Sequence, residues 1–177
     1  MKTFIGQPAR FLSVVSILAG FMLFPVSEGW AQAKAGDAKQ QIVGVWRLVS
    51  VVNTTDGVVT KGSSFGPNPN GRFIFTSSGH YASVNSNPNL PKFASGNRMQ
   101  GTPEEYKAVV HGSTASFGTY SVSADGKVLT LKNEGGTWAH WTGTEQKRDL
   151  TLAGDDMKYS LDASRGGRSE LVYKRVK

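Results

Sequence analysis

Residues 143–152 read GTEQKRDLTL, and in this segment charged side chains alternate with uncharged or apolar ones. Glu145, Lys147 and Asp149 share one face, because successive side chains of a β-strand point to opposite sides. The opposite face carries Thr144, Gln146, Arg148, Leu150 and Leu152. This pattern predicts a strand with one face in water and the other in the protein interior.

Similar segments follow one another along most of the chain. They cover residues 42–53, 58–61, 72–76, 80–85, 118–123, 128–132, 157–162 and 170–176. Short turn sequences separate many of them, including Asp56-Gly57, Ser77-Ser78-Gly79, Asp125-Gly126 and Asp155-Asp156. About eight or nine strands joined mainly by hairpins predict an all-β, antiparallel sandwich or barrel.

One segment has the pattern of a helix instead. Thr102 suits the N-cap position, Pro103 suits the first helical position, and Glu105 completes a capping box. We predict a short helix that ends near residue 112. Its apolar face, which we expect to pack against the strands, consists of Tyr106, Val109 and Val110.

The first 33 residues have the anatomy of a secretory signal peptide. Lys2 and Arg10 precede an apolar run over residues 11–26, and a small-x-small cleavage motif ends at Ala33. The apolar run is short for a membrane span, which needs about 20 residues. We therefore predict cleavage near Ala33, a flexible leader over residues 34–41 and one domain over residues 42–177. The mature protein is expected in the periplasm or outside the cell, with no membrane span.

Composition excludes several classes of function. The chain has 177 residues, a formal net charge of +7 and no cysteine. Without cysteine there is no disulfide, no thiol chemistry and no lipid-anchored lipoprotein. The basic residues are scattered, so we predict no nucleic-acid partner. His80, His111 and His140 lie in different segments without ligand spacing, so we predict no metal and no cofactor.

Six short segments occur together in one order. They are IVGVWRLVS at 42–50, FGPNPNG at 65–71, GTPEEY at 101–106, FGTY at 117–120, GTEQKR at 143–148 and LVYKRV at 171–176. Over nearly all of the mature chain this set resembles the bacterial and fungal lipocalin-like domain family. The resemblance implies an antiparallel, mostly up-and-down barrel of the calycin type with about eight strands and one short helix. It also implies a cavity for a small molecule.

The resemblance also assigns three residues to one end of the barrel. Gly44 and Trp46 match the first-strand motif of lipocalins, in which a basic residue near the last strand packs on the tryptophan. Arg175 is the matching residue here, and strand alternation independently places it on an inward face. We interpret the pair as a cation–π contact that closes this end, in preference to a ligand contact.

A second candidate site follows from the arginine in the opening segment. Arg148 and Gln146 share a face with two leucines, and a charge that faces an apolar interior needs a partner. One hypothesis is that Arg148, Gln146 and Tyr120 bind the head group of an acyl-type or aromatic acid. The alternative is an internal partner for Arg148, for which the sequence offers Tyr120, Tyr159 and Glu134.

Trp138, His140 and Trp141 form an aromatic cluster just before the same strand. In a barrel this position lies near a rim, where aromatic side chains can hold an apolar ligand. The alternative is a hydrophobic cluster that packs beneath a long loop.

These observations favour an exported protein that binds a small hydrophobic or amphipathic molecule, which could carry a carboxylate. Two alternatives remain: an enzyme of cyclase or isomerase type, and a filled barrel with a structural or interaction role in the envelope. No paired titratable groups occur at a diagnostic spacing, so we assign no catalytic residue.

Overall fold

A computed structural model describes residues 35–62, 64–162 and 166–177, so the predicted signal peptide lies outside the described residues. The elements are α1 (Ala35–Gln41), β1 (Gly44–Thr55), β2 (Val58–Lys61), β3 (Asn70–Phe75), β4 (His80–Ser86), α2 (Pro103–Gly112), β5 (Ser113–Val122), β6 (Val128–Gly136), η1 (Ala139–Trp141), β7 (Glu145–Ala153), β8 (Asp156–Asp162) and β9 (Arg168–Arg175). In this described part, no helix is long and apolar enough to cross a membrane.

The strands form one antiparallel sheet that closes on itself. Its order is β2-β1-β3-β4-β5-β6-β7-β8-β9, and β1 also pairs with β9. Eight strands therefore make the closed barrel, and β2 is an additional strand that pairs with the far end of β1. The predicted all-β, up-and-down barrel is confirmed, because each barrel strand from β3 onward pairs with the next one along the chain.

Strand alternation predicts most of the interior correctly. In β7, Arg148, Leu150 and Leu152 are buried, whereas Glu145, Lys147 and Asp149 are exposed. Thr144 was expected to face inward, but it precedes β7 and is exposed. Its hydroxyl instead donates to the Trp141 carbonyl at 2.6 Å, within the turn that leads into the strand.

A helix occupies the segment predicted as a flexible leader. Ala35–Gln41 forms α1, and Ala38 within it is only 1% exposed. Ile42, four residues later, is fully buried in the same core. Burial of these two apolar side chains explains why the segment folds here. Ala38 lies in a short, polar, alanine-rich stretch, and the sequence alone does not indicate that this alanine packs into the core.

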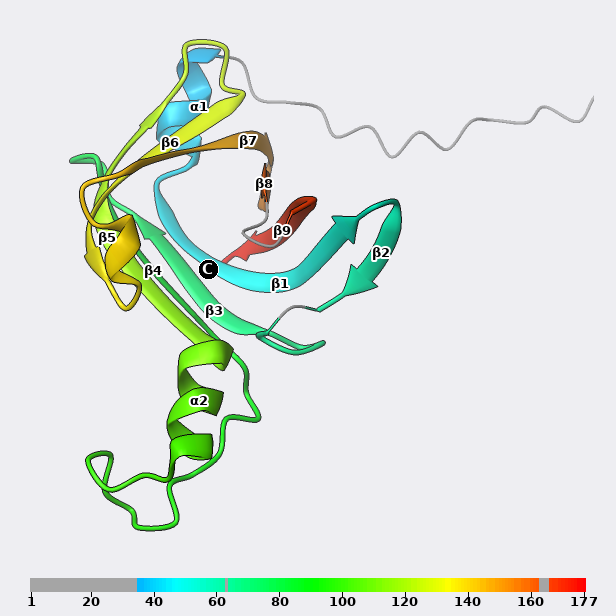
Figure 1. Cartoon of the computed structure of the whole chain (residues 1–177). Helices are drawn as coiled ribbons and strands as arrows, with labels where there is room; N and C mark the ends of the chain where they lie inside the picture. The colour runs from blue at the N-terminus through cyan, green and yellow to red at the C-terminus, as the bar shows by residue number, and fades with distance from the viewer. Residues whose placement is uncertain (1–34, 63, 163–165) are drawn as a thin grey trace, which may run out of the picture.

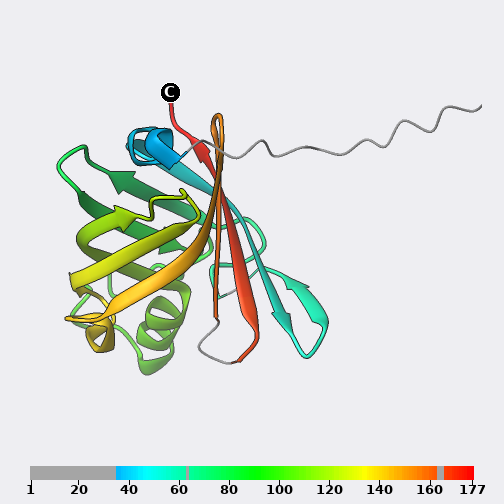
Figure 2. The same ribbon diagram turned by 90° about the horizontal axis from the view of Figure 1, so that it is seen from above.

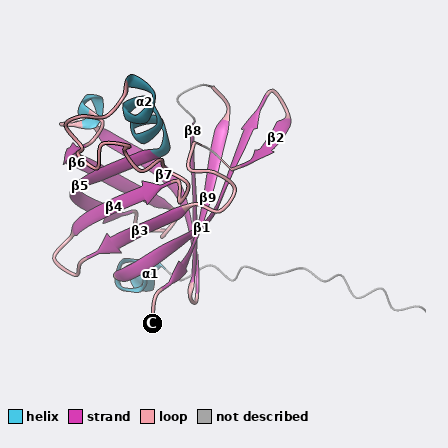
Figure 3. Ribbon diagram, turned by 90° about the horizontal axis from the view of Figure 1, so that it is seen from below, coloured by secondary structure: helices cyan, strands magenta, loops and turns pink. Residues whose placement is uncertain are grey.

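The two ends of the barrel differ. Figures 2 and 3 show α1 and the C-terminus at one end, and α2 with the β1–β2 hairpin at the other. We call these the closed end and the open end. The connections at the open end are residues 56–69, 87–112, 137–144 and 163–167, of which 63 and 163–165 are not described.

The interior changes character between the two ends. Towards the closed end it is apolar and fully buried, with Trp46, Leu48, Phe75, Leu129, Leu152 and Met157. Further from this end, β4, β5, β6 and β7 carry buried polar side chains, whereas β1 and β9 carry the buried apolar Val51 and Leu171. The buried polar residues are Ser83, Asn85, Ser116, Asn133 and Arg148. The polar side chains of β4–β7 make this side of the interior suited to a ligand with a polar group.

Helix α2 begins as predicted but packs differently. The Thr102 hydroxyl accepts from the Glu105 amide, and Glu105 accepts from the Thr102 amide, which completes the capping box. The expected packing of its apolar face against the barrel is wrong, because Val110 is 66% exposed. Tyr106 stacks edge-on against Phe93 of the preceding loop, with ring centroids 5.3 Å apart. The helix therefore projects from the open end (Figure 1).

Candidate functional site

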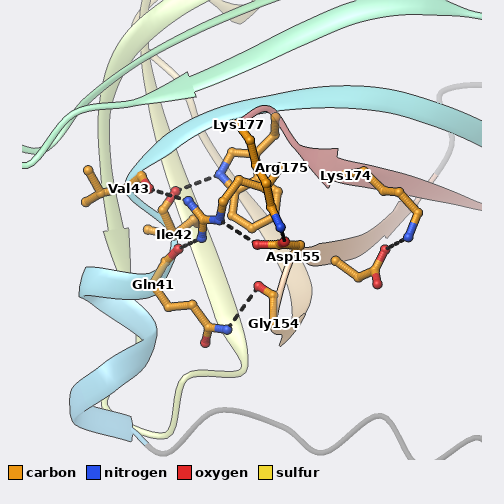
Figure 4. Close-up of polar contacts among 10 residues, drawn as sticks. Gln41, Ile42, Val43, Gly154, Asp155, Lys174, Arg175 and Lys177 are labelled. Atoms are coloured by element: carbon orange, nitrogen blue, oxygen red, sulfur yellow. Dashed lines mark hydrogen bonds and ion pairs between the residues drawn. The ribbon is translucent and has the colours of Figure 1, made fainter.

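The closed end is sealed by an arginine that lies on a tryptophan. The Arg175 guanidinium lies 4.1 Å from the centroid of the Trp46 ring, which is fully buried. It donates to the carbonyl of Val43 at 2.8 Å and to the carbonyl of Gln41 (Figure 4). The Trp46 indole donates to the Ile42 carbonyl at 2.7 Å. These contacts join β9, β1 and the end of α1. The Arg175 guanidinium and the Trp46 indole are both bonded to groups of the protein itself.

Asp155 completes the charge balance at this end. Its carboxylate lies 3.5 Å from Arg175 and 2.8 Å from Lys177 (Figure 4). A hydrogen bond from Lys177, together with the positive charges of Lys177 and Arg175, lowers the pKa of the Asp155 carboxyl below its ordinary value. Arg175 is therefore paired with an anion of the protein itself, which leaves no role for a ligand anion here.

Gly44 makes this arrangement possible. Its φ is 130°, a conformation that side-chain-bearing residues rarely adopt, and a Cβ there would lie 2.8 Å from Arg175 Nη1. We expect Gly44→Ala to lower the free energy of unfolding by about 1–3 kcal/mol, through backbone strain and displacement of the guanidinium. Urea denaturation tests this. Gly96→Ala, at an exposed loop glycine with open space around it, controls for strain alone because its φ of 66° is also positive.

Arg148 lies inside the barrel, on the inward face of β7. It is 7% exposed, and its guanidinium lies 4.6 Å from the Tyr159 ring centroid and 6.0 Å from that of Phe73. Its Nη2 donates to Gln146 Oε1 at 2.9 Å, whereas Nε is buried without a partner. Among the described residues no carboxylate oxygen lies within 4.0 Å of this guanidinium. Arginine stays protonated in proteins, so Arg148 is a buried cation that no carboxylate of the described residues pairs with.

Three buried tyrosines, Tyr81, Tyr159 and Tyr173, also belong to this interior. Burial raises the pKa of the Tyr81 hydroxyl and raises that of Tyr173 well above its ordinary value. Tyr81 donates to Asn133 Oδ1 at 2.6 Å, and the hydroxyls of Tyr159 and Tyr173 lie 3.2 Å apart. Of these tyrosines, Tyr159 lies against the Arg148 guanidinium, and its ring does not neutralise the charge.

A pocket of about 380 Å³ lies at the open end. Its lining includes Trp138 and Trp141, from η1 and the residue before it, and Val109, Val110 and His111 of α2. Other lining residues are Ser64, Phe65, Ser113, Thr114 and Thr137. The pocket is therefore largely aromatic and aliphatic, which suits the apolar part of a small molecule.

Comparison with known families agrees with this architecture. The family model described as a lipocalin-like domain matches residues 43–175. The chain belongs to the lipocalin-like domain family. This family assignment and the closed barrel together suggest binding of a small molecule. No curated protein sequence matches this lipocalin-like chain.

Several solved structures are similar to it. A redesigned β-barrel has a TM-score of 0.42 and 14% identity, covering 79% of this chain and 96% of that one. An uncharacterized protein from Bacteroides eggerthii has a TM-score of 0.40 and 14% identity, with coverages of 76% and 98%. The redesigned β-barrel mFAP1, in complex with DFHBI, has a TM-score of 0.40 and 16% identity, with coverages of 78% and 98%.

The lipocalin-like barrel brings together only part of the predicted ligand site. Gln146 and Arg148 are in contact, as expected from their shared face. Tyr120 does not join them. Its hydroxyl donates to the Thr76 carbonyl at 2.8 Å, and its ring packs edge-on against Phe75 near the closed end. Strand β6 lies between them, since Leu131 pairs with Tyr120 on one side and with Gln146 on the other.

The aromatic cluster divides in a similar way. Trp138 and Trp141 line the mouth pocket, whereas His140 stacks against Trp138 with centroids 5.1 Å apart. Trp138 is 50% exposed, so the cluster forms a rim and is not a buried hydrophobic core. In the described part of the chain, no three His, Cys, Asp or Glu side chains converge in a way that could hold a metal ion.

Sequence reasoning missed two polar residues of the barrel interior. Asn85 is 5% exposed on the inward face of β4, and Thr114 lies opposite it on β5. Asn85 Oδ1 and Thr114 Oγ1 are buried without a hydrogen-bond partner. Strand alternation alone could have placed Asn85 inward, since His80, Ala82 and Val84 are exposed on the other face of β4.

Proposed function

We propose that this protein binds a small amphipathic molecule with a carboxylate, whose charged group contacts Arg148 and whose apolar part fills the mouth pocket. The observation that carries this proposal is the buried Arg148 guanidinium, which has no carboxylate within 4.0 Å among the described residues. A buried cation is unfavourable unless an anion and hydrogen bonds compensate it. A ligand carboxylate supplies both.

The interior fixes the orientation of this guanidinium. Gln146 holds Nη2, and the Tyr159 ring supports the guanidinium from one side. The planar fork of arginine matches the two oxygens of a carboxylate, so a guanidinium that is already held binds with a small loss of conformational entropy. Gln146 therefore acts as a positioning residue, and Arg148 as the anion-binding residue.

The mouth pocket supplies the affinity for the apolar part. Its volume of about 380 Å³ lies within the range of small-molecule sites, which begins near 300 Å³. Removing apolar ligand surface from water contributes about 25 cal/mol for each Å², and two tryptophans with Phe65 and Val109 provide the contact surface. A carboxylate head and an apolar tail of moderate length therefore match the polar and apolar parts of the site.

We expect dodecanoate to bind saturably, with one molecule per chain, when isothermal titration calorimetry is used. Trp138→Ala should weaken this binding about fivefold to tenfold, because Trp138 contributes contact area at the rim. Phe117→Ala is the matched control. Phe117 is 53% exposed, close to the 50% of Trp138, but it lies outside the pocket lining. Equal affinity in both variants would place the tail elsewhere, and no binding in the wild type would favour a filled barrel.

We further propose that the chain is exported and cleaved near Ala33. Supporting this, the sequence has the charged start, apolar run and cleavage motif of a signal peptide. Cleavage there would leave α1 intact, since the helix begins at Ala35. Intact-mass spectrometry of protein from the envelope fraction of the producing cell should give the mass of residues 34–177. A cytosolic chain that retains residues 1–33 would refute export.

A further inference from the structure

Three buried polar side-chain atoms lack hydrogen-bond partners within the described residues: Arg148 Nε, Asn85 Oδ1 and Thr114 Oγ1. Their residues occupy inward positions of β7, β4 and β5. Buried polar atoms are nearly always paired in folded proteins, so three such atoms require an explanation.

A series of contacts connects the three residues that carry these atoms. Thr114 lines the mouth pocket and is the strand partner of Asn85. The Asn85 side chain hydrogen-bonds the Tyr173 hydroxyl, which lies 3.2 Å from the Tyr159 hydroxyl. The Tyr159 ring in turn supports the Arg148 guanidinium at 4.6 Å. Through these contacts, Thr114 and Asn85 connect the mouth pocket to the residues around Arg148.

The hydrogen-bonding roles of these atoms are fixed by chemistry. Arg148 Nε can only donate, and an amide oxygen such as Asn85 Oδ1 can only accept. Burial keeps the Tyr173 hydroxyl protonated by raising its pKa, and the Asn85 contact opposes that shift, as expected if its amide group donates to the Tyr173 oxygen. The Asn85 amide nitrogen is then engaged, and its oxygen is left to accept. Thr114 can either donate or accept.

The position of Asn85 depends on a glycine of the neighbouring strand. A Cβ at Gly71 would lie 2.2 Å from Asn85 Oδ1, so any other residue there would displace the amide. The two residues are register partners in β3 and β4. A glycine at this position leaves room for the Asn85 amide in the wall of the barrel. An apolar side chain would fill the same space without needing a hydrogen-bond partner.

We propose that the ligand is an organic acid with a hydrogen-bond donor, a hydroxyl or an amide N–H, close to its carboxylate, and that Asn85 and Thr114 bind this donor. This inference rests on the proposed function, because the carboxylate at Arg148 sets the direction of entry. Hydroxy acids and N-acyl amino acids share this chemistry. Asn85 and Thr114 are specificity-determining residues in this assignment, and Arg148 supplies affinity for every acid.

Matched ligand pairs test the donor directly. We would titrate the protein with dodecanoate, with 2-hydroxydodecanoate and its 2-methoxy analogue, and with N-decanoylglycine and N-decanoylsarcosine. The methoxy and sarcosine compounds keep the carboxylate and the tail but lack the donor. We expect at least one donor-bearing acid to bind about tenfold more tightly than its donor-free partner, as the loss of one buried hydrogen bond predicts. The pair that shows the difference identifies hydroxyl or amide as the donor.

Two variants assign the effect to residues. Thr114→Val and Asn85→Leu keep the size of each side chain, and each should reduce the tenfold preference, measured as the ratio of the two affinities within a ligand pair in the same variant. Thr130→Val, on the outer face of β6, is the control. Far-UV circular dichroism verifies folding, and the ligand pairs test the proposal on the wild type even if Asn85→Leu fails to fold.

The outcomes separate the two proposals. Equal affinities within both ligand pairs would overturn the donor assignment and leave acid binding intact. A preference that survives in both variants would overturn the roles of Asn85 and Thr114. If none of the five acids binds, the proposed function fails, and the donor assignment fails with it.

Discussion

Replacing Trp46 with alanine is expected to lower the free energy of unfolding by about 3–5 kcal/mol, the range for a large aromatic side chain removed from a packed core. Trp46 is fully buried, and its indole nitrogen donates to the Ile42 carbonyl. Its removal also leaves the Arg175 guanidinium without the ring on which it lies at 4.1 Å. The cavity, the lost hydrogen bond and the lost cation–π contact act in the same direction.

Urea denaturation followed by far-UV circular dichroism measures this effect. Trp138→Ala is the matched control, because Trp138 is half exposed at the open end and its removal should change stability by less than about 1 kcal/mol. A Trp46→Ala variant that unfolds at the same urea concentration as the wild type would show that the closed end does not depend on this seal.

Replacing Arg148 with methionine is expected to have opposite effects on binding and on stability. Binding of dodecanoate should weaken about 10- to 100-fold, because a charge-assisted hydrogen bond to the carboxylate is lost. In the absence of ligand, stability should rise by about 1–3 kcal/mol, since an apolar side chain of similar length replaces a buried cation without a carboxylate partner. A functional group that costs stability is expected at a binding site.

Calorimetric titration and urea denaturation of the same preparation test both parts. Arg47→Met provides the control, because Arg47 is exposed on the outer face of β1 and its replacement removes the same charge from the molecule. Binding by the control should stay within about twofold of the wild type. A large loss of stability in Arg148→Met would show instead that the guanidinium serves the fold through its contacts with Gln146 and Tyr159.

Local sequence predicted the elements of the barrel well. Alternation identified the strands because one face of each strand contacts water and the other contacts the core. The capping box at Thr102 and Glu105 correctly placed the start of α2, since both partners lie within four residues of each other. Helix α1 was missed, because its stability comes from the burial of Ala38 and Ile42 against distant strands.

The candidate site was predictable in part for the same reason. Gln146 and Arg148 are two residues apart on one strand face, so their contact follows from local geometry. Tyr120 was grouped with them because it also faces inward, but alternation gives the face of a residue and not its neighbours in the barrel. The exposure of Val110 was not predicted for a similar reason, since an apolar helix face does not specify which surface will cover it.

By itself, the sequence determined the strand pattern, the inward position of Arg148 and the start of α2, all of which depend on neighbours a few residues away. The tertiary structure decided which inward residues meet: Arg175 with Trp46 at the closed end, and Arg148 with Tyr159 beneath the open end. It also brought Trp138 and Val109 into the lining of one pocket. These contacts join segments far apart in the chain, and closing the barrel fixes the strand register that aligns them.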